Sequence, residues 1–418
     1  MNSPSTSEIS PRANWKTAGL LFLGSWIFFL IHIQFPRGHS FDEFHYIPAA
    51  KQWLQGGEVL NLEHPPLAKY FIAAGIGLWG DIPIGWRFFS SLFGAATLVG
   101  IWAWAEALTQ SRRIALWVAG VTLCNQLLYV QARIGMLDTP MFAFAVWALV
   151  ILTRALKGPQ TASKWLAMGA LFGLSIACKW FGVVIWGAAI LLLVFMKGRG
   201  SLKGVSWGNL FLYCGVIPWG VYFFTFIPYF FGSGPLHSLS DWFNLQYTMY
   251  DSQLRVIRPH PYMSHAIDWL IPSRPIWYSF DKEGNSNEWV RGVLLLGNPL
   301  IMIGGLGALA ACSLRWLKER SLELGLVLYF WFALFGSWFL IPRQIAFYYY
   351  YYPAGMLLGL ALGLAVSDSR LREERLSFLR WSFLGASLGL FIYFYPILSA
   401  LKIPIEAFRK WMWLQTWI

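Results

Sequence analysis

Long apolar runs separated by short polar turns are the feature that most constrains the fold of this chain. A bilayer core of about 30 Å takes about 20 apolar residues per helix, and the runs add up to about eleven such crossings. Hydrophobic residues make up 57% of the 418 residues and charged residues only 12%. A soluble domain has no need of so much apolar surface. The sequence therefore predicts an all-α polytopic membrane protein.

Only two polar segments between the runs are long, at residues 36–81 and 232–291. Both are expected to be extracytoplasmic loops of a single transmembrane domain that spans residues 1–418, without a separate soluble domain. The apolar runs lie at about 18–35, 84–108, 114–131, 137–156, 164–178, 180–196, 207–231, 292–313, 321–341, 345–366 and 377–398.

Lys and Arg indicate the orientation of the chain. The formal charge is +12, but the basic residues form short clusters between apolar runs, which is typical of topology signals rather than of nucleic-acid binding. With the N-terminus in the cytoplasm, every basic short loop falls on the cytoplasmic side, and the C-terminal tail falls outside. This alternation requires residues 164–196 to form a hairpin of two short helices broken near Lys179. One long tilted helix is the alternative.

The alternation also brings the unusual polar residues to one membrane boundary. In the first loop, FDEFH contains the adjacent acids Asp42 and Glu43. Two interpretations are compatible. Ser40 to Glu43 has the spacing of a capping box, with Gly56-Gly57 as the helix end, and a carboxylate beside the bilayer could act as a general base toward an acceptor hydroxyl.

Further along the first loop, His64-Pro65-Pro66 predicts a rigid turn into the next helix, or a support that directs His64 and Lys69 toward an anion. Ionisable residues within or beside apolar runs are expensive, so they suggest function or mutual pairing. Arg133 and Asp138 either pair with each other or help to hold a phosphate, as Lys179 and Arg343 could.

The second loop gathers polar and aromatic residues in HPYMSHAIDWLIPSRPIWY. The spacing of its His and Asp residues fits no closed zinc site, so no metal is expected, and an amphipathic interfacial helix is an equal interpretation. The run FYYYYYP predicts an aromatic belt at the interface, or rings and hydroxyls offered to a sugar or lipid phosphate. The four cysteines fall in apolar runs and are expected to be small core residues: Cys124, Cys178, Cys214 and Cys312.

Taken in order, FDEFH, EHPPLAK, RIGMLDTPM, GLSIACKWFG, the HPYMSH segment, LLGNPL and RQIAFYYYYYP resemble the protein O-mannosyltransferases, which are multi-spanning GT-C glycosyltransferases. The resemblance covers residues 40 to 400. It implies an eleven-helix plan and inverting transfer of mannose from a polyprenyl-phosphate carrier to a Ser or Thr hydroxyl of a protein or peptide on the extracytoplasmic face. No cofactor is implied, since the lipid-linked sugar is a substrate.

The resemblance also implies roles for individual residues. Asp42 is the expected base, with Glu43 beside it in the acidic pair. The residues expected to bind the donor's phosphate or sugar are His64, Lys69, Arg133, Asp138, Lys179, Arg343 and Tyr349. The residues of the second loop expected on the acceptor side are His260, Tyr262, His265, Trp269 and Arg274.

Residues 232–291 are too few for the folded luminal domain of eukaryotic members, so the sequence looks like a bacterial member in the plasma membrane, with its site facing the periplasm or exterior. Related enzymes use other sugars and lipid or glycan acceptors, which is the first alternative. A lipid or solute transporter and a non-catalytic subunit are the others. Against transport, the charges gather at one boundary and no repeat is visible. The oligomeric state is not indicated.

Overall fold

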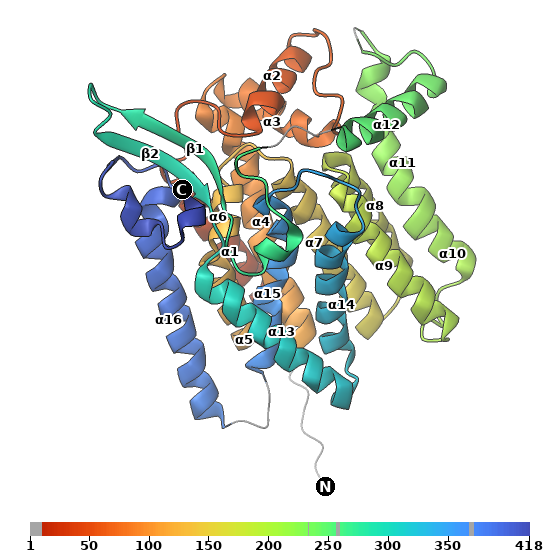
Figure 1. Ribbon diagram of the computed structural model, residues 1–418. Coiled ribbons are helices and arrows are strands. Elements are labelled where there is room, and N and C mark those ends of the chain that lie inside the picture. Colours follow the sequence, from red (N-terminus) through yellow and green to blue (C-terminus); the bar gives the residue numbers. More distant parts are fainter. Residues whose placement is uncertain (1–10, 233, 256–259, 368–371) are drawn as a thin grey trace.

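The computed structural model describes residues 11–232, 234–255, 260–367 and 372–418, and it is predominantly helical, as the sequence predicted (Figure 1). The α-helices are α1 (Pro11–Leu30), α2 (Glu43–Leu54), α3 (Leu67–Trp79), α4 (Pro83–Thr109), α5 (Arg112–Leu123), α6 (Gln126–Gln131), α7 (Asp138–Lys157), α8 (Ala162–Cys178), α9 (Phe181–Gly198), α10 (Trp207–Phe211), α11 (Ile217–Phe224), α12 (Leu239–Leu254), α13 (Pro299–Glu319), α14 (Leu322–Gly336), α15 (Tyr352–Ala365) and α16 (Glu373–Leu398).

A π turn at Leu212–Val216 joins α10 to α11. The 3₁₀ turns are Ile227–Phe230, Ala266–Trp269, Ser337–Phe339, Tyr348–Tyr351, Phe408–Trp411 and Gln415–Trp417. The strands are β1 (Ile276–Glu283), β2 (Trp289–Leu295) and β3 (Ile403–Pro404).

The long helices form a bundle that is built to lie in a membrane. Within the described ranges, six helices are long and apolar enough to cross: α4, α7, α9, α13, Leu322–Phe339 and α16. Of their apolar windows, 78% in α4 and 72% in α7 are buried, against 28% in α9 and α16. The first two therefore form the centre, and the other two present apolar side chains outward. The count of eleven crossings and the sidedness of the termini stay predictions.

Most expected apolar runs correspond to helices, although several bounds differ; α15, for example, begins only at Tyr352 in the run predicted from residue 345. The run at 114–131 is interrupted after Cys124, where the Asn125 side chain accepts the Leu127 N–H and starts α6 as a new helix. The run predicted from residue 292 begins as strand β2, and α13 starts only at Pro299 behind the cap residue Asn298.

The predicted break near Lys179 is confirmed. Lys179 has extended backbone angles, φ −160° and ψ 140°, and it separates α8 from α9. The two helices pack side by side (Figure 1). A single long helix over residues 164–196 is therefore excluded.

The first loop folds only partly as the sequence predicted. The Ser40 N–H donates to Glu43 Oε2 over 2.8 Å, but α2 begins at Glu43 with Asp42 as its cap residue and without a side-chain cap hydrogen bond, so the predicted capping box is not formed. The helix ends just before Gly56, whose φ of +65° suits glycine. Pro66 is the cap of α3, so the diproline does form the rigid entry turn.

The second loop contains structure that the sequence did not indicate. Helix α12 follows α11, and β1 and β2 form an antiparallel hairpin with an irregularity between Trp277 and Ser279. Strand β3 extends it to a three-stranded sheet in the order β1-β2-β3. An interfacial helix over 260–274 is wrong, because that segment holds only the turn Ala266–Trp269. Figure 1 shows α2, α3, α12 and the hairpin gathered at one end of the bundle.

Candidate active site

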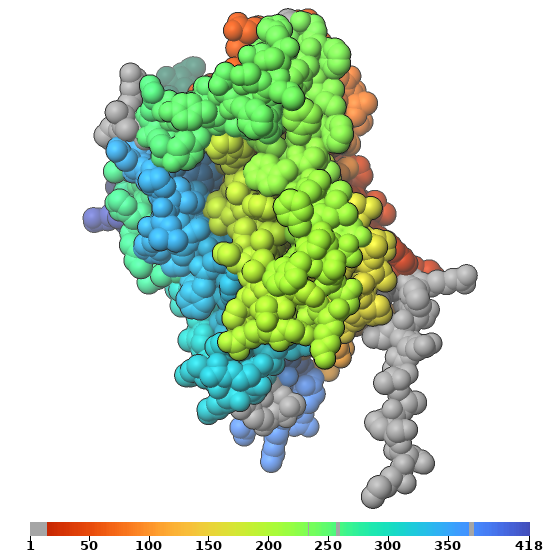
Figure 2. All heavy atoms as spheres, turned by 90° about the vertical axis from the view of Figure 1, so that its right-hand side faces the viewer, coloured from red at the N-terminus to blue at the C-terminus, as the bar shows by residue number. Residues whose placement is uncertain are grey.

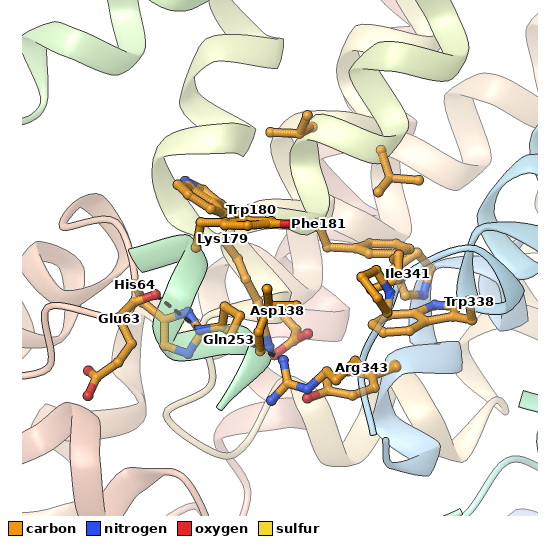
Figure 3. Close-up of a pocket in the computed structure, with 17 residues that line it drawn as sticks. Glu63, His64, Asp138, Lys179, Trp180, Phe181, Gln253, Trp338, Ile341 and Arg343 are labelled. Carbon is orange, nitrogen blue, oxygen red and sulfur yellow. Dashed lines mark hydrogen bonds and ion pairs between the residues drawn. The ribbon is translucent and has the colours of Figure 1, made fainter. Parts of the chain in front are cut away.

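A cavity of about 320 Å³ opens at the end of the bundle where both long loops lie. Figure 3 shows its walls, and Figure 2 shows the surface hollowed between the yellow-green segment around α9 and the blue segment that follows α14. The lining residues come from the first loop, the ends of α7, α9 and α12, and the turn after α14. They divide into a polar part and an apolar part.

The polar part is centred on Lys179 and Asp138. Lys179 stands in the break between α8 and α9, and its Nζ lies 2.8 Å from Oδ2 of Asp138, the first residue of α7. The ammonium also lies 4.9 Å from the ring centre of Tyr349 and 5.6 Å from that of Tyr350. Both members of the pair line the cavity. A cation fixed in this way is available to an anionic group.

Arg343 brings a second cation to the cavity. Its Nη1 donates to Gln253 Oε1 over 2.6 Å and its Nε to the Ile345 carbonyl over 3.0 Å. The guanidinium lies over the Tyr350 ring, 5.2 Å from its centre. Because guanidinium offers several donors in one plane, Arg343 is suited to bind phosphate oxygens beside Lys179.

The apolar part adjoins these cations. The ring centres of Phe181 and Trp338 lie 5.1 Å apart in a stacked arrangement, which joins the start of α9 to the 3₁₀ turn after α14. The other apolar residues of the cavity include Trp180, Val183, Val184, Leu254, Ile341 and Pro342. A cavity with two cations at one end and hydrocarbon walls at the other suits an amphiphile with an anionic head.

Asp42 lies at the start of α2, and its Oδ2 accepts a hydrogen bond from the Tyr46 hydroxyl over 3.0 Å. Burial raises the pKa of this carboxyl above its ordinary value, and the positive charge of Lys179 opposes the rise. His64 lines the cavity beside Tyr46, with the two rings 5.7 Å apart. Burial, reinforced by Lys179, holds the pKa of His64 well below its ordinary value. The imidazole is therefore neutral near pH 7.

Neither Asp42 nor Glu43, the other acid of the pair, is among the residues that line the cavity. The Glu43 carboxylate is fully buried and forms a paired salt bridge to Arg87 of α4, with both contacts at 2.8 Å. It also accepts the N–H groups of Ser40 and Gly135, over 2.8 and 2.7 Å. With both oxygens occupied, its geometry favours a positioning role over the predicted catalytic one.

Arg87 is a structural residue that sequence reasoning missed. Besides Glu43, it donates to the carbonyls of Ile33, Pro36 and Gly38 over 3.0, 2.8 and 3.1 Å. It therefore ties the chain after α1 to both α2 and α4. The available signal was a lone Arg three residues into the apolar run at 84–108.

Lys69 and Arg133 are buried but lie outside the cavity lining. Lys69 Nζ donates to the carbonyls of Asn61 and His64, over 2.5 and 3.0 Å, and so holds the loop that carries His64. Arg133 donates to the carbonyls of Phe29 and Ile31, over 3.2 and 2.9 Å. The predicted pairing of Arg133 with Asp138 is wrong, because Asp138 pairs with Lys179.

Of the five acceptor-side residues, His260 and Tyr262 lie together, with ring centres 5.7 Å apart, and the five do not form one cluster. His260 packs edge-on against Phe41, next to Asp42, and its Nδ1 accepts the Tyr262 N–H over 3.1 Å. Trp269 is fully buried and donates to Ser264. His265 is exposed, and its backbone N–H donates to the Asp268 side chain. Arg274 is half-buried and donates to the carbonyls of Pro261 and Thr416.

The tyrosine run is not an interfacial belt. Tyr348 to Tyr352 are all buried, with exposed fractions of 0 to 5%. Tyr350 stacks on Trp338 with ring centres 4.4 Å apart and lines the cavity, whereas Tyr349 contributes its ring face to Lys179. The alternative, in which the run serves the site, fits this placement. Among the described residues, no three His, Cys, Asp or Glu side chains are grouped to hold a metal ion.

Comparison with known proteins bears on the family. Residues 63–222 match the family model described as dolichyl-phosphate-mannose-protein mannosyltransferase. Residues 238–417 match the model of the C-terminal four-transmembrane region of protein O-mannosyltransferase. The chain belongs to the protein O-mannosyltransferase family. The matches cover most of the apolar helices and the second long loop from residue 238, but they begin at residue 63 and therefore do not include Asp42 or Glu43 of the first loop.

Several proteins of similar sequence are bacterial. A polyprenol-phosphate-mannose–protein mannosyltransferase of Mycolicibacterium smegmatis is 26% identical over 453 residues, covering 90% of this chain and 87% of its own. Proteins of the same name from Mycobacterium tuberculosis and Corynebacterium glutamicum are each 24% identical, over 90% of this chain and 86% and 88% of theirs.

Solved structures share the fold. The Saccharomyces cerevisiae Pmt1–Pmt2 complex bound to the sugar donor aligns with a TM-score of 0.81 at 15% identity, covering 96% of this chain and 93% of that one. ArnT from Cupriavidus metallidurans bound to undecaprenyl phosphate aligns with a TM-score of 0.61 at 16% identity, covering 91% and 64%. The chain therefore has the GT-C fold that the resemblance implied.

Proposed function

We propose that this protein transfers mannose from a polyprenyl-phosphate carrier to a Ser or Thr hydroxyl of an acceptor protein. The observation that carries the proposal is the cavity in which Lys179 and Arg343 adjoin an apolar groove close to Asp42. That combination suits a phosphate with a long hydrocarbon tail. The names of the bacterial relatives give the same donor and acceptor classes.

The residues divide the reaction between them. Asp42 accepts the proton of the acceptor hydroxyl, whose oxygen then forms a bond to the anomeric carbon. The bond from that carbon to the phosphate oxygen breaks, polyprenyl phosphate leaves, and the configuration at the sugar carbon inverts. Lys179 and Arg343 stabilise the charge that grows on the leaving phosphate.

Two further statements belong to the proposal. Because the two cationic side chains meet the leaving phosphate, transfer requires no divalent metal and persists in the presence of a chelator. The site faces the extracytoplasmic side of a bacterial plasma membrane, where the acceptor is a secreted or surface polypeptide. The charge distribution supports this sidedness, since the short loops at the opposite end carry the basic clusters.

Asp42→Asn tests the base. The amide keeps the shape of the side chain but accepts no proton, so transfer from lipid-linked mannose to an acceptor peptide should fall to background in isolated membranes. The matched control is Glu58→Gln, which neutralises an exposed carboxylate of the same loop and should transfer normally. Near-normal turnover by Asp42→Asn at normal expression would refute the base assignment.

The acceptor is tested by mass spectrometry of surface proteins and glycolipids from cells with and without the protein. We expect hexose to be lost from surface proteins. A loss confined to lipid-linked glycans would instead favour the alternative acceptor. Uptake by proteoliposomes without any glycosyl transfer would favour a transporter.

A further inference from the structure

Helix α12 divides its surface into three parallel strips. In a helix of 3.6 residues per turn, one arc of about 80° contains only apolar and aromatic residues, and the next arc of about 80° contains only polar ones. The apolar arc is Leu239, Phe243, Tyr247, Tyr250 and Leu254, and the polar arc is Ser240, Asn244, Thr248 and Asp251. The third strip faces the protein.

The inward strip attaches α12 firmly to α11. Leu245 and Met249 are buried. The Trp242 ring lies 5.3 Å from Phe223 and 6.1 Å from Phe226, and the Tyr222 hydroxyl donates to Gln246 over 2.6 Å. The orientation of the other two strips is therefore set by packing.

The apolar arc has no cover in the described structure. The exposed fractions are 61% for Leu239, 65% for Phe243, 71% for Tyr247 and 50% for Tyr250. A row of large exposed apolar side chains on a protein surface marks a site of interaction with a protein or a membrane. The arc lies beside an apolar surface, because neighbouring α11 exposes Phe224 and Trp219, at 65% and 40%.

The same arc leads into the cavity. Tyr250 and Leu254, at its C-terminal end, line the cavity wall. On the inward strip, Gln253 accepts from Arg343 and donates to the Glu63 carbonyl over 3.2 Å, so α12 joins the two sides of the polar part. Figure 2 shows the green segment that contains α12 above the hollow.

We propose that α12 is an interfacial helix whose apolar arc lies among the lipid acyl chains of the leaflet at which the cavity opens. Aromatic side chains with a polar tip favour this depth, and a helix with one apolar and one polar strip lies flat in the interface. Tyr250 and Leu254 then form the lip that a hydrocarbon chain crosses between the leaflet and the cavity. This last step rests on the proposed function.

Single cysteines test the placement directly. The four native cysteines are buried, so a fluorescent label attached at Phe243→Cys, Tyr247→Cys, Asn244→Cys or Thr248→Cys reports one position. In nanodiscs that contain spin-labelled phospholipid, labels at 243 and 247 should be quenched several-fold more than labels at 244 and 248. Equal quenching of both arcs, or of neither, overturns the proposal.

Donors of different chain length test whether the hydrocarbon chain passes Tyr250 and Leu254 on its way into the cavity. Phe243→Ser combined with Tyr247→Ser should raise KM several-fold for a long polyprenyl-phosphate mannose, with kcat unchanged. It should leave KM unchanged for a short, water-soluble isoprenyl-phosphate mannose. Asn244→Ala with Thr248→Ala is the control and should change neither. An equal rise in KM for both donors refutes this path for the hydrocarbon chain.

The two experiments separate the two proposals. The quenching experiment needs no catalysis. If the expected quenching pattern is not seen, the placement of α12 in the interface is refuted and the proposed mannose transfer is unaffected. If the unmodified protein transfers mannose from neither donor while the quenching pattern holds, the proposed function fails and the interfacial helix stands.

Discussion

Asp42 differs from an ordinary surface aspartate in its charge environment. Burial raises its pKa, the charge of Lys179 limits the rise, and the Tyr46 hydroxyl is bonded to the same carboxylate. A general base works only when deprotonated, so activity is lost as the pH falls through this raised pKa.

The rate of transfer should therefore fall on acidification at a pH above about 3.9, the ordinary value for aspartate. The pH dependence of kcat/KM, measured with purified protein in nanodiscs, shows this fall as the acid limb of the profile. Since the pKa of His64 is held well below its ordinary value, the limb should persist in His64→Asn. An acid limb that disappears in His64→Asn would assign the titration to the imidazole.

Substitutions of Arg343 test whether its guanidinium N–H donors stabilise the leaving phosphate. Arg343→Met should lower kcat by about 10²–10³-fold, the usual loss when one stabilising donor is removed. Arg343→Lys should recover part of the loss, because it keeps the charge and loses the planar geometry. Arg199→Met, at the exposed far end of α9, is the control. Equal activity of the Lys and Met variants would exclude an electrostatic role for Arg343.

At the scale of residues, the sequence identified ionisable side chains that lie beside or within apolar runs, where a buried charge costs free energy. Lys179 and Arg343 stand beside apolar runs, and both line the cavity. Arg133 gave the same signal, but it donates to backbone carbonyls instead, as does Lys69 of the first loop. Charge in an apolar segment predicts a partner without saying whether that partner is a ligand or the protein's own backbone.

At the scale of elements, the Glu43–Arg87 pair joins α2, α4 and the chain after α1. It also reaches the turn before α7 through Gly135, where a Cβ would lie 3.2 Å from Glu43 Oε1. Glycine is needed there for close approach. Since Asp42 precedes Glu43 directly, this buried pair fixes the position of the proposed base.

Glu43→Gln should destabilise the protein by about 3–5 kcal/mol, because it leaves the buried Arg87 guanidinium without its counter-charge. Thermal unfolding in detergent measures the loss. The double variant Glu43→Leu with Arg87→Leu should lose less than the two single changes added together. For comparison, Lys51→Gln breaks an exposed pair with Asp81 and should cost about 0–1 kcal/mol. Additive losses would show that the pair is not coupled.

Elements were predictable where local signals set them. Hydropathy located the long helices, and the diproline located the start of α3, whereas the S-x-x-E signal indicated a capping box that α2 does not form. The β1–β2 hairpin and the burial of the tyrosine run could not be predicted from the sequence, because both depend on contacts between distant segments. Tyr278 of β1, for example, stacks on Phe41 of the first loop with ring centres 5.0 Å apart.

At the scale of the whole molecule, sidedness stays a prediction with a direct test. Asn285 lies exposed at the hairpin tip, and Lys203 lies exposed in the turn between α9 and α10. A membrane-impermeant maleimide should label Asn285→Cys in cells whose plasma membrane is intact, and Lys203→Cys only after the membrane is opened. The reverse pattern would invert the proposed orientation.

The two cations of the cavity also bear on how a catalytic cycle ends. The phosphate of the donor is a diester with one negative charge, whereas the released polyprenyl phosphate is a monoester carrying about 1.5 to 2 charges at neutral pH. Lys179 and Arg343 therefore attract the spent carrier more strongly than the loaded one, while the apolar wall holds the same tail in both. We expect product inhibition by polyprenyl phosphate, so that removal of the spent carrier from the leaflet would govern how fast the enzyme works in a membrane.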